Sequence, residues 1–248
     1  MQWFEDEEFW RIFYPWMFAA ERRFQAAPLE VEQLLALSGV SGGAALDLCC
    51  GPARHSLLLA EKGFRVTGVD RTPFLLAKAK ERAASAGASI EFVQCDARDF
   101  LRPGAFDLAV NLFTSFGYFE TREEDLTLLR NVRTSLKPGG VFIMDLVGKE
   151  CVAASPGKTR WEQSSDGDIL IDHAEVVPGW AKLRLHWLLV KGEQARRFSF
   201  DLNLYSGVEL CAALERAGFS DIQIFGSLAG APYDAKSLRL VARAVAPG

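Results

Sequence analysis

The segment ALDLCCGPARHS, residues 45–56, most constrains the fold, because an apolar run leads directly into a turn of small residues. Pro52 suits the first turn of a helix, where the N–H that proline lacks would be unpaired anyway. The next apolar run, RVTGVD, ends in Asp70 about 20 residues after the turn. This order of elements predicts a parallel α/β sheet: a strand, a tight turn, a helix, and a second strand that ends in an acid. A small polar ligand would bind at the carboxyl edge of such a sheet.

The rest of the chain continues this alternation of strands and helices. Helical patterns separate short apolar runs, as in βαβ units. We expect strands at 44–49, 65–69, 90–94, 106–112 and 140–146, and helices at 53–62, 73–86 and about 122–136. Gly63 and Gly87 lie where helix-ending glycines belong, and the segment 137–140 reads as a turn. Near the end of the chain we expect a helix at 206–217 and strands at 219–225 and 237–245.

Two segments depart from this pattern. Aromatic residues recur at helical spacing within 5–25, which predicts an amphipathic helix that is broken or kinked near Pro15. A second helix is expected from Pro28 to about Ser38. Residues 1–38 would form a helical cap. Between 150 and 204, strand-like runs alternate with Asp-Gly, Pro-Gly and Gly-Glu turns, which predicts a small inserted antiparallel sheet. We expect one domain over 1–248.

Composition narrows the class of protein. The chain has 248 residues with 49% hydrophobic and 24% charged residues, so a substantial core is expected. Its net charge of −4, without a basic run, argues against a nucleic-acid partner. No window approaches about 18 uncharged apolar residues, so no membrane span is expected. Five cysteines without a C-x-x-C pair and three histidines argue against a metal site or disulfides, and favour a cytoplasmic location.

The turn at 47–53 and the acid at 70 indicate a nucleoside-bearing cofactor, because a carboxylate there can accept hydrogen bonds from both hydroxyls of a ribose. Two cofactor classes compete. A dinucleotide usually requires G-x-G-x-x-G, of which this turn retains only Gly51. A cofactor with an amino-acid tail instead needs an acid beside the turn, which Asp47 supplies.

Several motifs follow one another along the chain: ALDLCCGPARHS, GFRVTGVDRTPFLL, FVQCDARDF, FDLAVNLFTSFGYF, LKPGGVFIMDL and ELCAALERAGFSDIQIFG. In this order they resemble the landmarks of class I S-adenosylmethionine-dependent methyltransferases. The resemblance covers about 40–148 and 205–245. It implies a Rossmann-like, mostly parallel seven-stranded sheet with helices on both faces, and S-adenosyl-L-methionine as cofactor. The usual D-x-G-x-G-x-G reads here Asp47-x-Cys49-x-Gly51-x-Ala53, so two small side chains replace glycines.

The resemblance also assigns roles to individual residues. The methionine part of the cofactor would face Asp47 and the turn from Cys49 through Gly51 to Ala53. Asp70 would hold the ribose diol and Arg71 would flank the adenine. At the adenine edge and the methyl group, the expected residues are Asp96, Ala97, Asn111, Leu112 and Phe113.

The sequence constrains the catalytic residues less than the cofactor site, because methyl transfer depends on positioning more than on a base. His55 would act as a general base or only hydrogen-bond locally. Asn111 and Asp145, near strand ends, would touch substrate or cap a turn. Tyr14 and Trp10 would belong to a lid, or the N-terminal helix would serve as core or dimer packing.

We expect a small-molecule acceptor with a nucleophilic N, O or C atom, and a possible homodimer. An aromatic cluster after the fourth strand would line an apolar pocket or pack the insertion: Phe113, Phe116, Tyr118 and Phe119. Two alternatives stay open. One is a NAD(P)-dependent oxidoreductase, and the other is a non-catalytic S-adenosylmethionine-binding protein.

Overall fold

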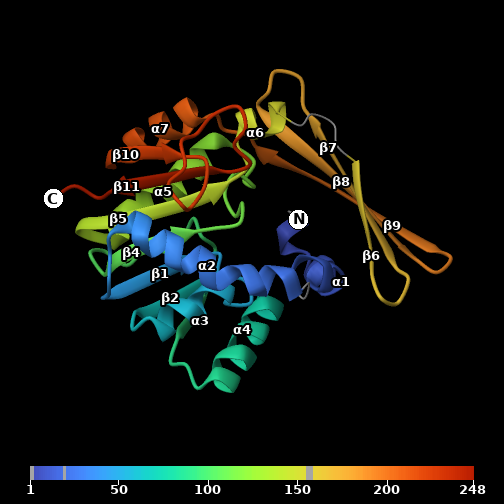
Figure 1. Cartoon of the computed structure of the whole chain (residues 1–248), viewed down its shortest axis with the longest axis horizontal. Coiled ribbons are helices and arrows are strands. Elements are labelled where there is room, and N and C mark those ends of the chain that lie inside the picture. Colours follow the sequence, from blue (N-terminus) through green and yellow to red (C-terminus); the bar gives the residue numbers. More distant parts are fainter. Residues whose placement is uncertain (1–2, 19–20, 155–158) are drawn as a thin grey trace.

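The computed structural model describes residues 3–18, 21–154 and 159–248. Its larger sheet has seven strands in the order β10-β11-β5-β4-β1-β2-β3 (Figure 1). Strands β1 to β5 pair in parallel, and β11 runs antiparallel to both β5 and β10. The strands are β1 (Ala44–Leu48), β2 (Arg65–Asp70), β3 (Glu91–Gln94), β4 (Phe106–Asn111), β5 (Leu136–Leu146), β10 (Ser220–Phe225) and β11 (Leu240–Val245). The expectation of an α/β fold with a mostly parallel sheet is confirmed.

Helices cover both faces of this sheet, which explains why the central strands are almost wholly apolar. One face packs against α5 (Arg122–Ser135) and α7 (Gly207–Arg216) in one buried cluster. The other packs against α2 (Glu21–Ser38) and α3 (Arg54–Glu61) in a second cluster. Helix α4 (Pro73–Ala86) contacts α3, β2 and β3. The strand order reverses between β1 and β4, and parallel α/β sheets form their ligand crevice at such a point.

The second sheet has four antiparallel strands in sequence order, β6 (Thr159–Gln163), β7 (Ile169–Val176), β8 (Lys182–Lys191) and β9 (Gln194–Asn203). In Figure 1 it stands to one side of the larger sheet, with α1 (Glu7–Met17) between the two. Phe9 and Phe13 of α1 are buried against Leu170, Leu189 and Phe200 of the smaller sheet. The N-terminal helix is therefore a packed part of the fold.

Several predicted boundaries were wrong. Helix α2 begins at Glu21 and contains Pro28, whereas we expected Pro28 to start the helix. A proline inside a helix costs about 3 kcal/mol, and the burial of Val31 and Leu34 against the sheet offsets it. Helix α1 continues through Pro15 and ends two residues later, at Met17.

The C-terminal half differs from expectation in three places. Residues 137–140, expected as a turn, belong to β5, and the register between β4 and β5 shifts there, as at a bulge. Helix α6 (Lys149–Ala153) was not anticipated. The last strand begins at Leu240 rather than at 237.

Candidate functional site

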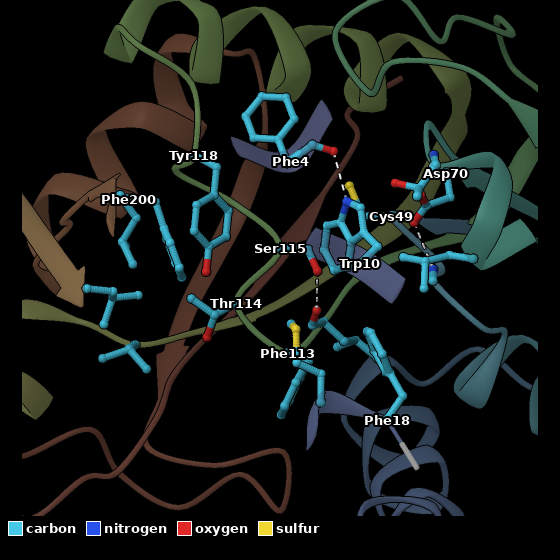
Figure 2. Close-up of a pocket in the computed structure, with 18 of the residues that line it drawn as sticks. Phe4, Trp10, Phe18, Cys49, Asp70, Phe113, Thr114, Ser115, Tyr118 and Phe200 are labelled. Carbon is cyan, nitrogen blue, oxygen red and sulfur yellow. Dashed lines mark hydrogen bonds between the residues drawn. The ribbon is translucent and has the colours of Figure 1, made fainter. Parts of the chain in front are cut away.

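A cavity of about 790 Å³ lies between the carboxyl edge of the larger sheet and the four-stranded sheet. Its volume falls in the usual range for small-molecule and cofactor sites, about 300–1,000 Å³. Residues from the ends of β1, β2 and β4, from α1 and from β7 to β9 line it. Figure 2 shows Asp70 and Cys49 at one end, and Tyr118 and Phe200 at the other. The cavity therefore has a polar end and an aromatic end.

The turn after β1 is built from left-handed backbone. Cys49, Gly51 and Ala53 have φ values of 61°, 53° and 63°. Left-handed backbone favours glycine, so Cys49 and Ala53 hold a conformation that costs about 1–2 kcal/mol per residue. Burial, together with nearby carboxylates, raises the pKa of the Cys49 thiol, which stays protonated.

Asp70, at the end of β2, ties this turn to its own strand. Its Oδ2 accepts the Gly51 N–H at 2.9 Å, and its Oδ1 accepts the Thr72 N–H at 2.9 Å. Burial raises the pKa of Asp70, although these hydrogen bonds act against that shift. A carboxylate oxygen can accept two hydrogen bonds, so each oxygen of Asp70 can accept a further one from a ligand in the cavity that Asp70 lines.

Asp47 and His55 lie on the other side of the turn. Asp47 accepts a hydrogen bond from Ser56 Oγ at 2.5 Å, and burial raises its pKa against the opposing effects of His55 and Ser56. His55 Nε2 lies 2.8 Å from Glu30 Oε2, the atom that also accepts from Arg54. Asp47, His55 and Arg54 all line the cavity.

The N-terminal segment covers the end near β3. Asp96 accepts hydrogen bonds from Arg98 at 2.9 and 3.0 Å; these lower its pKa although burial opposes the shift. The Arg71 guanidinium lies 5.0 Å above the Phe4 ring and 3.0 Å from the Glu5 carboxylate. Asp96, Arg71 and Phe4 all line the cavity. The N-terminal segment, which contains Phe4, therefore covers the polar end of the cavity.

The loop after β4 is held in an unusual conformation. Phe113 and Thr114 are both left-handed, with φ values of 61° and 58°, which is rare for a β-branched residue. Asp145 Oδ2 accepts the Phe113 N–H at 3.1 Å, and Arg239 donates to Asp145 at 2.5 Å and to Thr114 at 3.0 Å. This brace places Phe113 and Thr114 in the cavity wall.

Aromatic rings form the far end. Trp3 stacks on Phe200 with ring centroids 4.3 Å apart, and Tyr118 lies 5.0 Å from Trp3. Burial raises the pKa of Tyr118 to about 12, so its hydroxyl stays protonated. Figure 2 shows this hydroxyl directed toward Thr114, and Trp10 standing between the two ends of the cavity, its Nε1 bonded to the Phe4 carbonyl at 2.9 Å.

The structure brings together most of the residues that sequence singled out. Four of the candidate cofactor-binding and catalytic residues do not line the cavity. Asn111 donates to the Leu48 carbonyl at 3.0 Å, and Asp145 holds the loop after β4 from behind. Ala53 precedes α3 and is fully buried, and the Tyr14 ring packs 5.5 Å from Phe74. The residues that line it are Asp47, Cys49, Gly51, His55, Asp70, Arg71, Asp96, Ala97 and Leu112.

Other residues of the cavity wall were missed or left ambiguous by the sequence. Phe4, Phe18 and Arg239 line it without a local signal, because loops or helix ends far away in the sequence bring them there. Trp10 was one of two proposed lid residues, and it does line the cavity. In contrast, Phe116 packs against Tyr205 in the core, at a centroid distance of 5.4 Å.

Comparison with known proteins identifies the central segment of the chain. Residues 45–140 match the family described as a methyltransferase domain. This segment is a methyltransferase domain. The matched region contains the turn at Cys49 to Ala53, Asp70 and the braced loop, so the family signature coincides with the polar end of the cavity.

Individual relatives agree at the level of sequence and fold. The chain is 34% identical to the uncharacterized methyltransferase sll0829 of Synechocystis over 148 residues, 54% of this chain and 64% of that one. It is 28% identical to a cypemycin N-terminal methyltransferase of Streptomyces over 82% of both chains. The chain spans only 51% to 64% of the length of the two curated relatives that share 34% identity with it.

A solved structure of an S-adenosylmethionine-dependent methyltransferase from Clostridium acetobutylicum has the same fold. The TM-score is 0.78 at 16% identity, with 97% of this chain and 98% of that chain covered. The likeness therefore includes the four-stranded sheet and the N-terminal helices, which the family match does not reach.

Proposed function

We propose that this protein transfers a methyl group from S-adenosyl-L-methionine to an N, O or C nucleophile of a small molecule by in-line displacement. One observation carries the proposal: a single cavity joins the Asp47, Asp70 and Asp96 carboxylates to an aromatic end closed by α1 and the four-stranded sheet. Cofactor and acceptor would thus share one enclosed volume. This arrangement suits direct transfer between them.

The polar end fits the cofactor. Both oxygens of Asp70 retain acceptor capacity for the two ribose hydroxyls while they hold Gly51 and Thr72. Asp96, ionised beside Arg98, would accept from the adenine amino group. The left-handed turn brings its backbone close to the methionine portion, near Asp47.

The bound cofactor supplies an electrophilic methyl group on a sulfonium. The protein's own part is to hold the nucleophile in line and to exclude water, which in favourable cases lowers a barrier by about 7–11 kcal/mol. Trp10 and the Phe113–Thr114 loop lie between the two ends and would orient the acceptor. Positioning, more than proton transfer, would therefore account for the rate.

Three residues remain predicted catalytic residues. His55 is the best placed, because it lines the cavity and its ring is oriented by Glu30. Asn111 and Tyr14 would act indirectly, since neither lines the cavity. A cytoplasmic location and a homodimer likewise remain proposals. Among the described residues, no helix is long and apolar enough to cross a bilayer, and no cluster of His, Cys, Asp and Glu is suited to a metal ion.

Calorimetry with S-adenosylhomocysteine and with NADH tests the cofactor. We expect S-adenosylhomocysteine to bind and NADH not to bind; the reverse would support the oxidoreductase alternative. Methyl transfer is then measured with radiolabelled S-adenosylmethionine against amines, phenols and carboxylic acids. Tight binding of S-adenosylhomocysteine without transfer to any acceptor would support a non-catalytic binding protein.

A further inference from the structure

The four-stranded sheet contributes one wall of the cavity, and this wall is apolar apart from Arg160 and Asp172. Ala174, Leu185, Trp187 and Phe200 line the cavity from β7, β8 and β9. Side chains alternate between the faces of a strand, so Asp172 shares the face of Ala174, and it also lines the cavity. In the strand register, Asp172 lies directly opposite Trp187. A carboxylate thus sits within an aromatic and aliphatic wall.

Asp172 differs from the other acids of the cavity because its carboxylate has no partner within 3–18, 21–154 and 159–248. The other three acids are engaged: Asp47 by Ser56, Asp70 by two backbone N–H groups and Asp96 by Arg98. Placing an ionised group against apolar surface without a partner is costly. A half-buried acid in this position therefore points to a ligand that supplies the missing donor.

Among the described residues, the cation next to Asp172 in the sheet register is Arg160, its neighbour on β6. Arg160 also lines the cavity, and the described residues give it no ion pair. Its side chain is exposed, on an edge strand whose described residues are all exposed, so solvent screens its charge. Asp172 is the less exposed of the two and has Trp187 beside it, which makes it the stronger determinant of what binds.

We infer, on the basis of the proposed function, that the acceptor is an amine that Asp172 recognises. A carboxylate attracts an amine through charge-assisted hydrogen bonds, and the faces of Trp187 and Phe200 favour a cation. An alcohol or a phenol would gain less from this wall. The aliphatic and aromatic remainder of the cavity end would hold an apolar body on the amine.

The same carboxylate favours transfer to nitrogen. The bound ammonium first releases one proton to solvent, because only the neutral amine has the lone pair that attacks the methyl carbon. As the C–N bond forms, the bond between methyl carbon and sulfur breaks and its electron pair stays on sulfur. The positive charge therefore ends on the acceptor nitrogen, and the product is the methylated ammonium. A fixed negative group near that nitrogen stabilises the charge as it develops. Asp172 would thus bind the amine and lower the barrier to its methylation.

Calorimetry with matched probes tests the inference. We would titrate butylamine, cyclohexylamine and 2-phenylethylamine, and the alcohols of the same skeletons, into the protein with and without S-adenosylhomocysteine. We expect at least one amine to bind about tenfold more tightly than its alcohol. Asp172→Asn should weaken the binding of that amine about tenfold and leave the binding of the alcohol unchanged. Glu175→Gln, on the same strand but the opposite face, is the matched control and should change neither.

Equal binding of each amine and its alcohol, binding of none of the amines, or unchanged amine affinity in Asp172→Asn would overturn the inference. Unchanged affinity for S-adenosylhomocysteine shows that the Asp172→Asn variant is folded. The proposed function fails by a different result, namely wild-type protein that does not bind S-adenosylhomocysteine. An intact cofactor site without amine preference would refute only the role of Asp172.

Discussion

The backbone N–H of Gly51 donates to the Asp70 carboxylate across 2.9 Å, which joins the turn after β1 to the end of β2. The turn and the acid are therefore one unit. The same carboxylate holds Thr72, the residue before α4, with its other oxygen. One buried acid thus fixes the backbone on which a nucleoside would rest, and it also presents its oxygens to the cavity.

Asp70→Asn should weaken the binding of S-adenosylhomocysteine by about 10- to 100-fold. The amide replaces one acceptor oxygen with a donor, which removes a charge-assisted hydrogen bond to the ribose. The new NH2 group also faces the backbone N–H of either Gly51 or Thr72, and two donors cannot form a hydrogen bond. Calorimetry measures the change. Asp99→Asn, an exposed acid beyond β3, serves as the control and should bind like wild type. Wild-type affinity in Asp70→Asn would show that the ribose lies elsewhere.

Phe18→Ala should speed the release of S-adenosylhomocysteine by about tenfold. A Cβ built on Gly51 would lie 3.6 Å from the Phe18 ring, so this ring covers the turn from the cavity side. Its removal loses roughly 1–2 kcal/mol of apolar contact over the ligand. Stopped-flow displacement gives the rate. Leu29→Ala removes an apolar side chain that is 59% exposed on α2 and should leave the rate unchanged.

Local sequence signals were sufficient for the parts of the site that lie within a few residues of one strand end. Asp47 and Asp70 lie near the ends of two buried strands that pair directly, and Gly51 follows the first of them, so their proximity could be inferred from topology alone. Asp172 and Arg239 could not be found in this way. Asp172 reaches the cavity because the smaller sheet is docked against α1, and Arg239 because β11 pairs with β5 although they are far apart in sequence. Neither arrangement is encoded by a local pattern.

Backbone strain was signalled by the sequence in only one of two places. Cys49 and Ala53 stand where the family motif has glycines, and both adopt the left-handed conformation despite their side chains. Thr114 gave no such signal, because β-branched residues avoid this conformation. Its φ is imposed by Asp145 and Arg239, residues 31 and 125 positions away, which hold the loop from the far side.

Tyr118→Phe should lower kcat/KM for the methyl acceptor by about tenfold without a change in S-adenosylhomocysteine affinity. The Tyr118 ring lies at the aromatic end of the cavity with its hydroxyl directed toward Thr114, and a pKa of about 12 keeps that hydroxyl protonated as a donor. Its loss removes one hydrogen bond to the acceptor. Tyr233→Phe is the matched control, since Tyr233 does not line the cavity and its hydroxyl bonds to Glu150. Tyr14→Phe is measured beside it, and an effect of Tyr14→Phe alone would instead support Tyr14 as the catalytic residue.

Asp125, on α5, should make the protein less stable as pH rises. It is fully buried, and Asn203 and Tyr205 both donate to its Oδ2 at 2.8 Å. Burial raises its pKa from 3.8 to about 6, although these hydrogen bonds oppose the shift. A raised pKa means that the folded state holds the proton more tightly than the unfolded state. The resulting stabilisation is complete below about pH 4 and is lost as pH rises through about 6.

Asp125→Asn should remove that dependence. The amide oxygen accepts the same two hydrogen bonds and carries no charge to desolvate, and Oδ1 of Asp125 has no partner among the described residues. A shift of about two pKa units at 1.36 kcal/mol each gives about 3 kcal/mol. Urea denaturation should therefore show the variant gaining up to about 3 kcal/mol over wild type between pH 4 and pH 7.5. The control Glu120→Gln changes an exposed acid just before α5 and should follow wild type at every pH. A constant difference between Asp125→Asn and wild type across this range would mean that Asp125 stays ionised in the folded protein.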